Sequence, residues 1–205
     1  MDRLLRIVPP PADPAEDLAD DERLVAALRA RKPGALDALI RRHGGHLRRV
    51  LLRVLGANDS EISDVMQEVT VSAWQGIEGL AEARALKAWL TQIAVFTARA
   101  VIRRRQRGRW LSLLGEVPDR ALPWAGPELQ EAARAVYRIF DRMPVDERIP
   151  FALRMLEGLD LEATAAACGM SLATVRRRLV RAERRFFKMA RGQEILGPWL
   201  KEGMA

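Results

Sequence analysis

The sequence predicts an all-α protein of two small helical bundles joined by a flexible linker. Ala, Leu, Arg and Glu dominate the chain, and they are strong helix formers. Aromatic residues make up only 5%, and the runs of Val, Ile, Thr and Tyr that are typical of strands are missing from the sequence. Because 49% of the 205 residues are hydrophobic, the chain can bury a core, and we do not expect global disorder.

The first bundle, residues 22–107, follows an acidic and Pro-rich extension over residues 1–21. Apolar residues at helical spacing define its elements, and Pro or Gly residues separate them. The expected order is a short helix around 24–28 stopped by Pro33-Gly34, a helical pattern over 36–54 interrupted at Gly44-Gly45, a turn over 56–60, a helix over 61–77, a loop or short turn over 78–85, and a longer helix over 87–107.

A linker over residues 108–127 leads to the second bundle, residues 128–191. Gly115, Pro118, Pro123 and Gly126 mark the linker, although its Trp and Leu residues are unusually apolar for a free tether. The second bundle is expected to contain a helix from Leu129 to Met143 closed by Pro144, a helix through Leu153 that ends at Gly158, and two helices over 160–167 and 172–190, followed by a C-terminal tail over 192–205.

Charge is unevenly distributed along the chain. Residues 1–22 hold seven acidic residues against Arg3 and Arg6, a net charge of −5. Because the whole chain carries +7, the remainder carries +12, with arginines concentrated near residues 99–109 and 176–191. Such clustering points to a polyanionic partner, either nucleic acid or an anionic membrane.

Residues 160–186 have the proportions of a helix-turn-helix. Gly169 supplies the tight turn, and Ser171 is a good N-cap, with Met170 and Val175 placed as a hydrophobic staple across it. At about 100° per residue, the second helix separates an apolar face from a basic one. The apolar face is Val175, Leu179, Ala182 and Phe186, and the basic face is Arg177, Arg181, Arg184 and Lys188, flanked by Arg176, Arg178 and Arg185.

Such a helix suits the DNA major groove, where an arginine bonds two acceptors of guanine. A solvated basic face is the alternative. A membrane-surface helix is less favoured, because the apolar face is narrow and is matched to the preceding helix.

Two helices of the first bundle carry further signals. On helix 87–107, one side combines aromatic rings, arginines and an amide, a pattern that suits unstacked bases, although Trp89 and Phe96 would equally pack on a neighbouring helix. That side is Trp89, Gln92, Phe96, Arg99 and Arg103. Helix 61–77 has a polar stripe of Asp64, Gln67, Glu68 and Gln75 around Val71, which is more typical of a protein contact because its charges are negative.

Taken in order, these motifs resemble an extracytoplasmic-function (ECF) sigma factor of the sigma-70 family over residues 22–188. The first bundle has the D-x-x-Q-E helix at 64–68 closed by Trp74, then W-L-x-x-I-A at 89–94 and an R-R-R run at 103–105. The second bundle has E-G-L at 157–159, T-V-R-x-R-L at 174–179 and R-A at 181–182.

The resemblance implies a promoter-recognition factor with three binding surfaces. It implies that Asp64, Gln67, Glu68 and Val71 dock on core RNA polymerase, that Trp89, Gln92, Phe96, Arg99 and Arg103 contact the −10 element, and that Ser171, Thr174, Arg176, Arg177 and Arg181 contact the −35 element. It also implies that an anti-sigma factor holds the protein inactive. Because the N-terminus has too short an apolar run for a secretory signal, we expect a cytoplasmic protein. Thr91, Gln92 and Phe96 differ from the usual residues of the −10 helix, and Pro150 is expected only near the start of its helix.

An enzyme is not expected, since we find no nucleophile motif and no Gly-rich phosphate loop, and we assign no catalytic residue, cofactor or small-molecule substrate. His43 and His46 flank the paired glycines and are expected to be exposed in a helix break rather than to bind metal. Cys168 stands alone and is expected to be a small buried hydrophobe. We find no stretch of about 18 apolar residues that would span a membrane. An autonomous helix-turn-helix regulator is the main alternative function, and an interaction adaptor is another.

Overall fold

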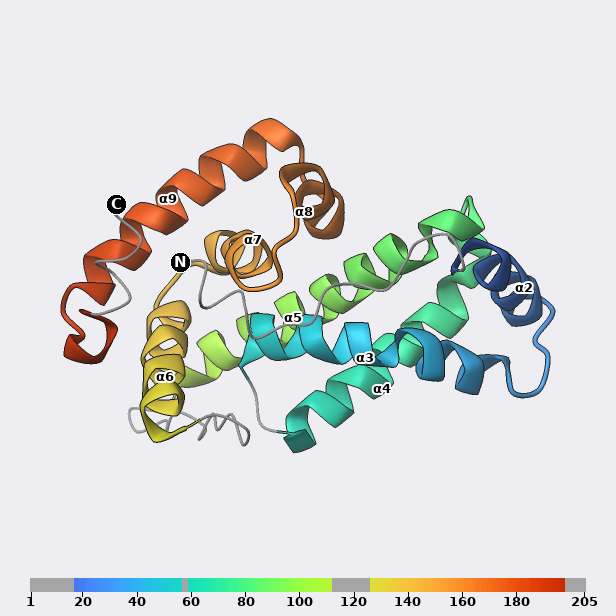
Figure 1. Cartoon of the computed structure of the whole chain (residues 1–205), viewed down its shortest axis with the longest axis horizontal. Coiled ribbons are helices and arrows are strands. Elements are labelled where there is room, and N and C mark those ends of the chain that lie inside the picture. The colour runs from blue at the N-terminus through green and yellow to red at the C-terminus, as the bar shows by residue number, and fades with distance from the viewer. Residues whose placement is uncertain (1–16, 57–58, 112–125, 198–205) are drawn as a thin grey trace.

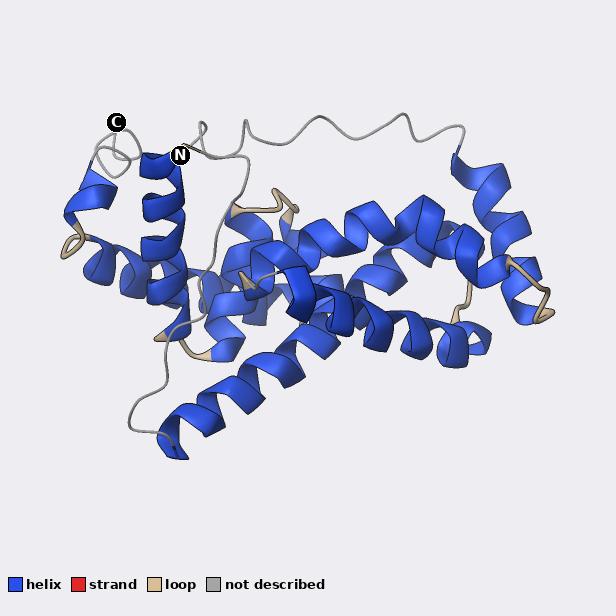
Figure 2. Cartoon of the chain, turned by 90° about the horizontal axis from the view of Figure 1, so that it is seen from below, coloured by secondary structure: helices blue, strands red, loops and turns tan. Residues whose placement is uncertain are grey.

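A computed structural model describes residues 17–56, 59–111 and 126–197, and these residues contain helices, turns and short connections but no strand (Figure 1, Figure 2). The all-α prediction is confirmed. In chain order the elements are α2 (Asp17–Arg29), α3 (Ala35–Leu55), α4 (Asp59–Gly76), the 3-10 turns η1 (Ile77–Gly79) and η2 (Ala83–Ala85), α5 (Leu86–Leu111), α6 (Pro127–Asp141), α7 (Val145–Met155), α8 (Leu161–Cys168), α9 (Leu172–Ala190) and η3 (Glu194–Leu196).

Helix α3 is continuous, and the predicted interruption at Gly44-Gly45 is wrong. The helix buries an apolar face that packs against both α4 and α5, and Val50, Leu51 and Val54 on that face are fully buried. Each glycine within a helix costs about 1 kcal/mol relative to alanine. The free energy gained by burying such an apolar face is larger than this cost. The helix ends instead at Gly56, whose φ of 57° is left-handed and whose N–H donates to the Leu52 carbonyl at 2.7 Å.

Helix α5 is the central element of the first bundle. It packs against α3 and α4, and it also contacts α8 of the second bundle. The helix extends to Leu111, so its last turn falls in the predicted linker of residues 108–127. The remaining linker residues from 112 to 125, with their glycines, prolines and Trp124, lie outside the described residues.

The second bundle begins at α6, where Pro127 occupies the first turn after the N-cap Gly126. Pro144 is the N-cap of α7, so it separates α6 from α7 as predicted. Pro150, however, lies inside α7 rather than near its start, which contradicts the sequence-based expectation. Because proline has no N–H, α7 lacks one backbone hydrogen bond at this position. Pro150 is buried in this helix of 11 residues, and its packing compensates for the lost bond.

Aromatic rings fill the core of the second bundle. Phe140 of α6, Phe151 of α7 and Phe186 of α9 meet with ring centroids 5.2 to 6.0 Å apart, mostly edge to face. Such pairs contribute about 0.5–1.5 kcal/mol beyond the area that they bury. This cluster fixes α9 against α6 and α7 and so determines which face of α9 points outward.

The two bundles pack against each other, an arrangement that the sequence did not predict. Figure 1 shows α6 and α7 beside the C-terminal halves of α3 and α5, and α8 beside the middle of α5. The buried apolar residues of α3, α5, α6 and α7 belong to one continuous core. Residues of the second bundle therefore contribute to the environment of the first.

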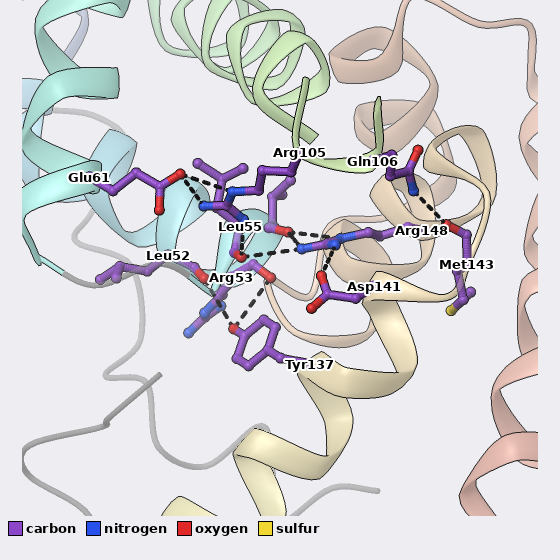
Figure 3. Close-up of polar contacts among 11 residues, drawn as sticks. Leu52, Arg53, Leu55, Glu61, Arg105, Gln106, Tyr137, Asp141, Met143 and Arg148 are labelled. Carbon is purple, nitrogen blue, oxygen red and sulfur yellow. Dashed lines mark hydrogen bonds and ion pairs between the residues drawn. The ribbon is translucent and has the colours of Figure 1, made fainter. Parts of the chain in front are cut away.

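Side chains from other elements cap the C-terminus of α3 (Figure 3). The last four carbonyls of a helix lack partners within the helix. Here the Tyr137 hydroxyl donates to the Leu52 carbonyl at 3.0 Å, and the buried Arg148 guanidinium donates to the carbonyls of Val54 and Leu55. Positive charge is favourable at this negative end of the helix dipole. Tyr137 and Arg148 belong to the second bundle, and Arg105 of α5, in the first bundle, also donates to the Leu55 carbonyl at 3.2 Å.

Candidate nucleic-acid interface

Helices α8 and α9 form the predicted helix-turn-helix, with a hydrogen-bonded cap at each of its junctions. The Asp160 carboxylate accepts from the Ala163 N–H at 2.7 Å at the start of α8. Gly169, with φ of 62°, ends α8, and the N–H groups of Gly169 and Met170 donate to the carbonyls of Ala166 and Ala165. Two residues later, Ser171 caps α9.

The predicted faces of α9 are confirmed. Val175 and Ala182 are fully buried, and Leu179 and Phe186 are half-buried against the rest of the bundle. The cations of the opposite face are exposed; they are Arg177, Arg181, Arg184 and Lys188. A row of guanidinium groups therefore faces outward along a helix whose N-terminus is open to a partner.

The structure brings the predicted −35 residues together in the first half of α9. Ser171, Arg176, Arg177 and Arg181 are exposed. Thr174 is half-buried. Its N–H donates to the Ser171 hydroxyl oxygen at 3.3 Å, and its own hydroxyl accepts from Ser171 at 3.0 Å. Thr174 therefore holds the N-terminal turn of α9 as well as lying next to the exposed arginines.

Two arginines that flank the basic face of α9 pair with acidic residues of α7. Arg185 donates to the Glu147 carboxylate at 2.9 Å, and Arg178 lies 3.7 Å from the Asp146 carboxylate. These pairs join α9 to α7, and Arg185 remains exposed while it pairs with Glu147.

The predicted −10 residues follow one side of α5 in different environments. Trp89 is half-buried, and its ring packs against Gly76, where an added Cβ would lie 3.4 Å from it. Phe96 is 46% exposed, unusually high for a phenylalanine. The Arg99 guanidinium lies over the Phe96 ring at 5.3 Å, and Arg103 is exposed one turn further along. Both interpretations of this pattern therefore apply: Trp89 packs within its own bundle, whereas Phe96 is exposed enough to stack on a base.

Helix α8 approaches this same side of α5. Arg99 Nη2 donates to the Cys168 carbonyl at 3.3 Å. A Cβ on Gly169 would lie 3.0 Å from Phe96 Cζ and 3.7 Å from Gln92 Nε2, so only glycine fits the turn without displacing Phe96. The predicted −10 surface therefore lies directly beneath the turn of the helix-turn-helix.

Asp146, which sequence reasoning missed, joins the two arginine-bearing surfaces. Its carboxylate lies 4.0 Å from Arg99 Nε and 3.8 Å from Arg103 Nη2 of α5, in addition to its contact with Arg178 of α9. Asp146 follows Pro144 and lies in the first turn of α7. Acidic residues are common in the first turn of a helix, because they are favourable at the positive end of the helix dipole. Nothing local in the sequence distinguishes it.

The predicted polymerase-binding residues share the outer face of α4. Ile62, Val65 and Val69 are buried on the inner face. On the outer face Val71 is 46% exposed, and the polar residues around it are exposed as well; they are Asp64, Gln67 and Glu68. An exposed valine within an acidic stripe suits a protein contact with a basic rim.

The two histidines are internal, which corrects the expectation that they are exposed in a helix break. His43 is buried, and its Nε2 lies 3.2 Å from the Asp21 carboxylate. The Thr91 hydroxyl donates to the Lys87 carbonyl, so it accepts a hydrogen bond from His46 Nε2 at 2.8 Å. Burial lowers the pKa of His46 to about 4, and the positive charge of Lys87 acts in the same direction. No cluster of three metal-ligating side chains occurs among the residues described.

Cys168 is buried, as predicted from the sequence, and burial raises the pKa of its thiol to about 11. One described helical stretch, Ala83–Arg107, is long and apolar enough to cross a membrane by length and composition alone. It consists of η2 and most of α5, and it packs against α3, α4 and α8.

Comparison with known proteins identifies the class of this one. Residues 39–108 match the Sigma-70 region 2 family, and residues 133–186 match Sigma-70, region 4. The chain is similar to the ECF RNA polymerase sigma-E factor of Haemophilus influenzae, with 30% identity over 82% of this chain and 93% of that one. It is also similar to the ECF RNA polymerase sigma factor SigM of Mycobacterium tuberculosis, with 29% identity over 82% of this chain and 84% of that one.

Two solved structures are similar in fold over most of this chain. The structure of CnrH in complex with the cytosolic domain of CnrY matches with a TM-score of 0.59 and 23% identity, over 85% of this chain and 99% of that one. The sigma factor RpoE in complex with the anti-sigma factor NepR from Bartonella quintana matches with a TM-score of 0.57 and 21% identity, over 78% of this chain and 99% of that one.

The chain therefore belongs to the sigma-70 family of transcription initiation factors. Within that family it is an ECF sigma factor, a non-catalytic protein that binds core RNA polymerase and promoter DNA and directs transcription initiation.

Proposed function

We propose that this sigma factor uses three separate surfaces in initiation. The outer face of α4, formed by Asp64, Gln67, Glu68 and Val71, binds core RNA polymerase. The side of α5 formed by Trp89, Gln92, Phe96, Arg99 and Arg103 captures the unpaired strand of the −10 element. The start of α9, formed by Ser171, Thr174, Arg176, Arg177 and Arg181, reads the −35 element.

The exposed cationic face of α9 is the observation that carries this assignment. Its arginines extend from a capped N-terminus that is free to enter the major groove, where a bidentate contact to guanine contributes about 1–3 kcal/mol of discrimination. Phe96 on α5 supports the −10 assignment, because an exposed ring beside Arg99 offers a base both stacking and a phosphate partner.

The same proposal includes the domain boundaries, a cytoplasmic location and an anti-sigma protein as the inhibitor. Residues 22–107 form the polymerase-binding and −10-binding domain, residues 108–127 the linker and residues 128–191 the −35-binding domain, with an acidic extension before them and a short tail after them. The factor acts in the cytoplasm, where its polymerase is. Because the similar structures are complexes with CnrY and NepR, we include an anti-sigma protein among its partners.

Reconstitution with core polymerase tests the proposal. The purified protein is mixed with bacterial core polymerase and genomic promoter fragments, and the start sites of the transcripts are mapped. We expect initiation at a defined set of promoters only when both proteins are present. An autonomous helix-turn-helix regulator would instead bind its operator tightly without polymerase, and that result would replace the proposal.

A further inference from the structure

Val180 is an apolar side chain in the middle of the outward face of α9. It is 48% exposed. A single exposed apolar residue needs no explanation on most surfaces. This one, however, is a β-branched residue that lowers helix propensity, and it stands on the face that the proposed function assigns to the −35 element. Its position on that face therefore bears on what the helix contacts.

The neighbours of Val180 on the surface of the helix are mostly arginines. Residues three and four positions apart are neighbours on a helix, and these positions hold Arg176, Arg177 and Arg184, all of which are exposed. The remaining neighbour is Glu183, the only acidic residue of α9, which lies about 120° from Arg177 and so at the edge of the cationic face. Val180 lies only about 60° from Arg177. A DNA groove that receives Arg177 therefore receives Val180 as well.

The major groove offers an apolar side chain one matching group, the methyl group of thymine. The isopropyl group of Val180 has no hydrogen-bond donor or acceptor. Against the amino, carbonyl or ring-nitrogen groups of the other bases it would cover a polar group without bonding to it, which costs free energy. Against a thymine methyl group, both partners lose apolar surface to water, which is favourable. The chemistry of this side chain therefore selects thymine.

The spacing along α9 limits where that thymine lies. A rise of about 1.5 Å per residue places Val180 about 14 Å from the N-cap Ser171, which is close to the width of the major groove of about 12 Å. The same rise places Val180 about 4.5 Å beyond Arg177 along the helix. Because successive base pairs are about 3.4 Å apart, the thymine should lie within about two base pairs of the base that Arg177 contacts.

We propose that Val180 is a further specificity-determining residue of this factor and that it contacts the 5-methyl group of a thymine in the −35 element. The inference rests on the proposed function, because it requires α9 in the major groove of that element. It adds one apolar contact to a surface whose other contacts are polar or charged. The factor then distinguishes a thymine beside the bases that its arginines contact.

Removal of single methyl groups from the promoter tests the proposal. Each thymine of the −35 element, on either strand, is replaced in turn by deoxyuridine, which lacks only the 5-methyl group. The two templates compete for a limiting amount of the reconstituted holoenzyme, and their transcripts, made different in length, are quantified. We expect one position at which loss of the methyl group lowers the transcript yield about fourfold, which corresponds to about 0.8 kcal/mol for one buried methyl group.

Two variants of Val180 connect this effect to the side chain. Val180→Ala should make the two templates compete equally, because the methyl group then has no apolar partner. Val180→Ile keeps an apolar side chain at this position and should retain the preference for thymine. If the Val180→Ala protein still distinguished the two templates fourfold, the difference would arise in the DNA itself and the proposal would be wrong.

Ile40→Ala is the matched control. Ile40 is an aliphatic side chain of α3 that is 43% exposed, and it lies outside the three proposed surfaces. The Ile40→Ala protein should initiate as the unmodified protein does and should keep the fourfold preference. Loss of the preference in this variant would show that the effect does not depend on a contact at Val180, which also refutes the proposal.

The failure of this inference can be distinguished from the failure of the proposed function. If the protein does not initiate with core polymerase, or if Arg177→Ala leaves the −35 preference unchanged, the proposed function is wrong. If Arg177→Ala relaxes the preference at one position but no thymine within two base pairs of it responds to loss of its methyl group, the proposed function stands and the role of Val180 is refuted.

Discussion

Arg148 of α7 donates to the carbonyl oxygen of Val54 in α3 through both Nε, at 3.2 Å, and Nη2, at 2.8 Å. The same guanidinium pairs with the buried Asp141 carboxylate at 2.7 Å. One side chain of the second domain therefore completes a helix of the first. This relationship links the stability of the first domain to the presence of the second.

Replacing Arg148 should strongly destabilise the folded chain. Arg148→Ala removes the hydrogen bonds from this side chain to the carbonyls of Val54 and Leu55 and leaves the buried Asp141 without this cation. Loss of one partner of a buried ion pair costs about 3–5 kcal/mol. Urea unfolding followed by circular dichroism measures the free energy of unfolding. Arg142→Ala, at an exposed arginine nearby, should change it by no more than about 0.5 kcal/mol. Equal stability of the two variants would show that the cap contributes little.

The arginines at the start of α9 should control promoter choice. Arg176→Ala and Arg177→Ala each should relax the sequence preference in the −35 element, because each loses a contact to a base edge, with a cost of about 1–3 kcal/mol at the preferred base. Lys188→Ala should weaken all promoters alike and reduce the salt dependence by about one unit. Transcription from a library of randomised −35 elements distinguishes these effects. Identical losses on every promoter for all three variants would contradict base reading.

Charge reversal on α4 should weaken polymerase binding without unfolding the protein. Glu68→Lys changes an exposed residue beside Val71, and a like charge opposite a basic rim should raise the Kd for core polymerase by about tenfold. Glu78→Lys introduces the same charge change at an exposed position in η1 and serves as the control. Titration of labelled protein with core polymerase measures both. If Glu78→Lys raised the Kd for core polymerase by the same factor, the effect would come from the overall charge of the protein and not from a contact at Glu68.

The buried imidazole of His46 should make the protein less stable in mild acid. Its pKa is about 4 in the folded chain, below the 6.5 of a free imidazole, because burial disfavours the charged ring even with the Glu157 carboxylate 3.8 Å from Nδ1. The unfolded chain therefore binds more protons between these pKa values, and stability present above pH 6.5 is lost as the pH falls toward 4. Protonation of this one residue lowers the free energy of unfolding by as much as about 3 kcal/mol.

His46→Gln keeps a side-chain donor for Thr91 and does not titrate, so its free energy of unfolding should fall less steeply between pH 7 and pH 5. Urea unfolding at several pH values compares the two proteins. Parallel pH profiles would mean that His46 is accessible to protons in the folded state.

Local patterns in the sequence predicted most of the architecture. The turn at Gly169, the Ser171 cap of α9, the buried face of α9 and the exposed face of α4 depend on local residue type and spacing, which are visible in a sequence. Gly44-Gly45 misled the prediction because the packing of α3 against α4 and α5, not local propensity, determines whether the helix continues. Pro150 misled the prediction in a similar way, because α7 continues through this buried proline despite its low helix propensity.

The contact between the domains could not be read from the sequence. Arg148, Asp146 and Glu157 act on residues that lie far from them along the chain, and each looks locally like an ordinary surface charge. Only one sequence clue points to Arg148: it falls at helical spacing beside Val145, Ile149 and Ala152, all of which are buried. A cation on the apolar side of a helix indicates a buried acceptor, but not where that acceptor comes from.

Gly56 illustrates a consequence for engineering. It closes α3 in a left-handed conformation, and any Cβ there would overlap the ring of Tyr137. Chimaeras that exchange the −35-reading half for that of another factor would keep this glycine but place a foreign surface against it. A graft that retains Tyr137 and Arg148 while changing only the outward residues of α9 should respect the fit, and so transfer promoter preference without loosening the rest of the molecule.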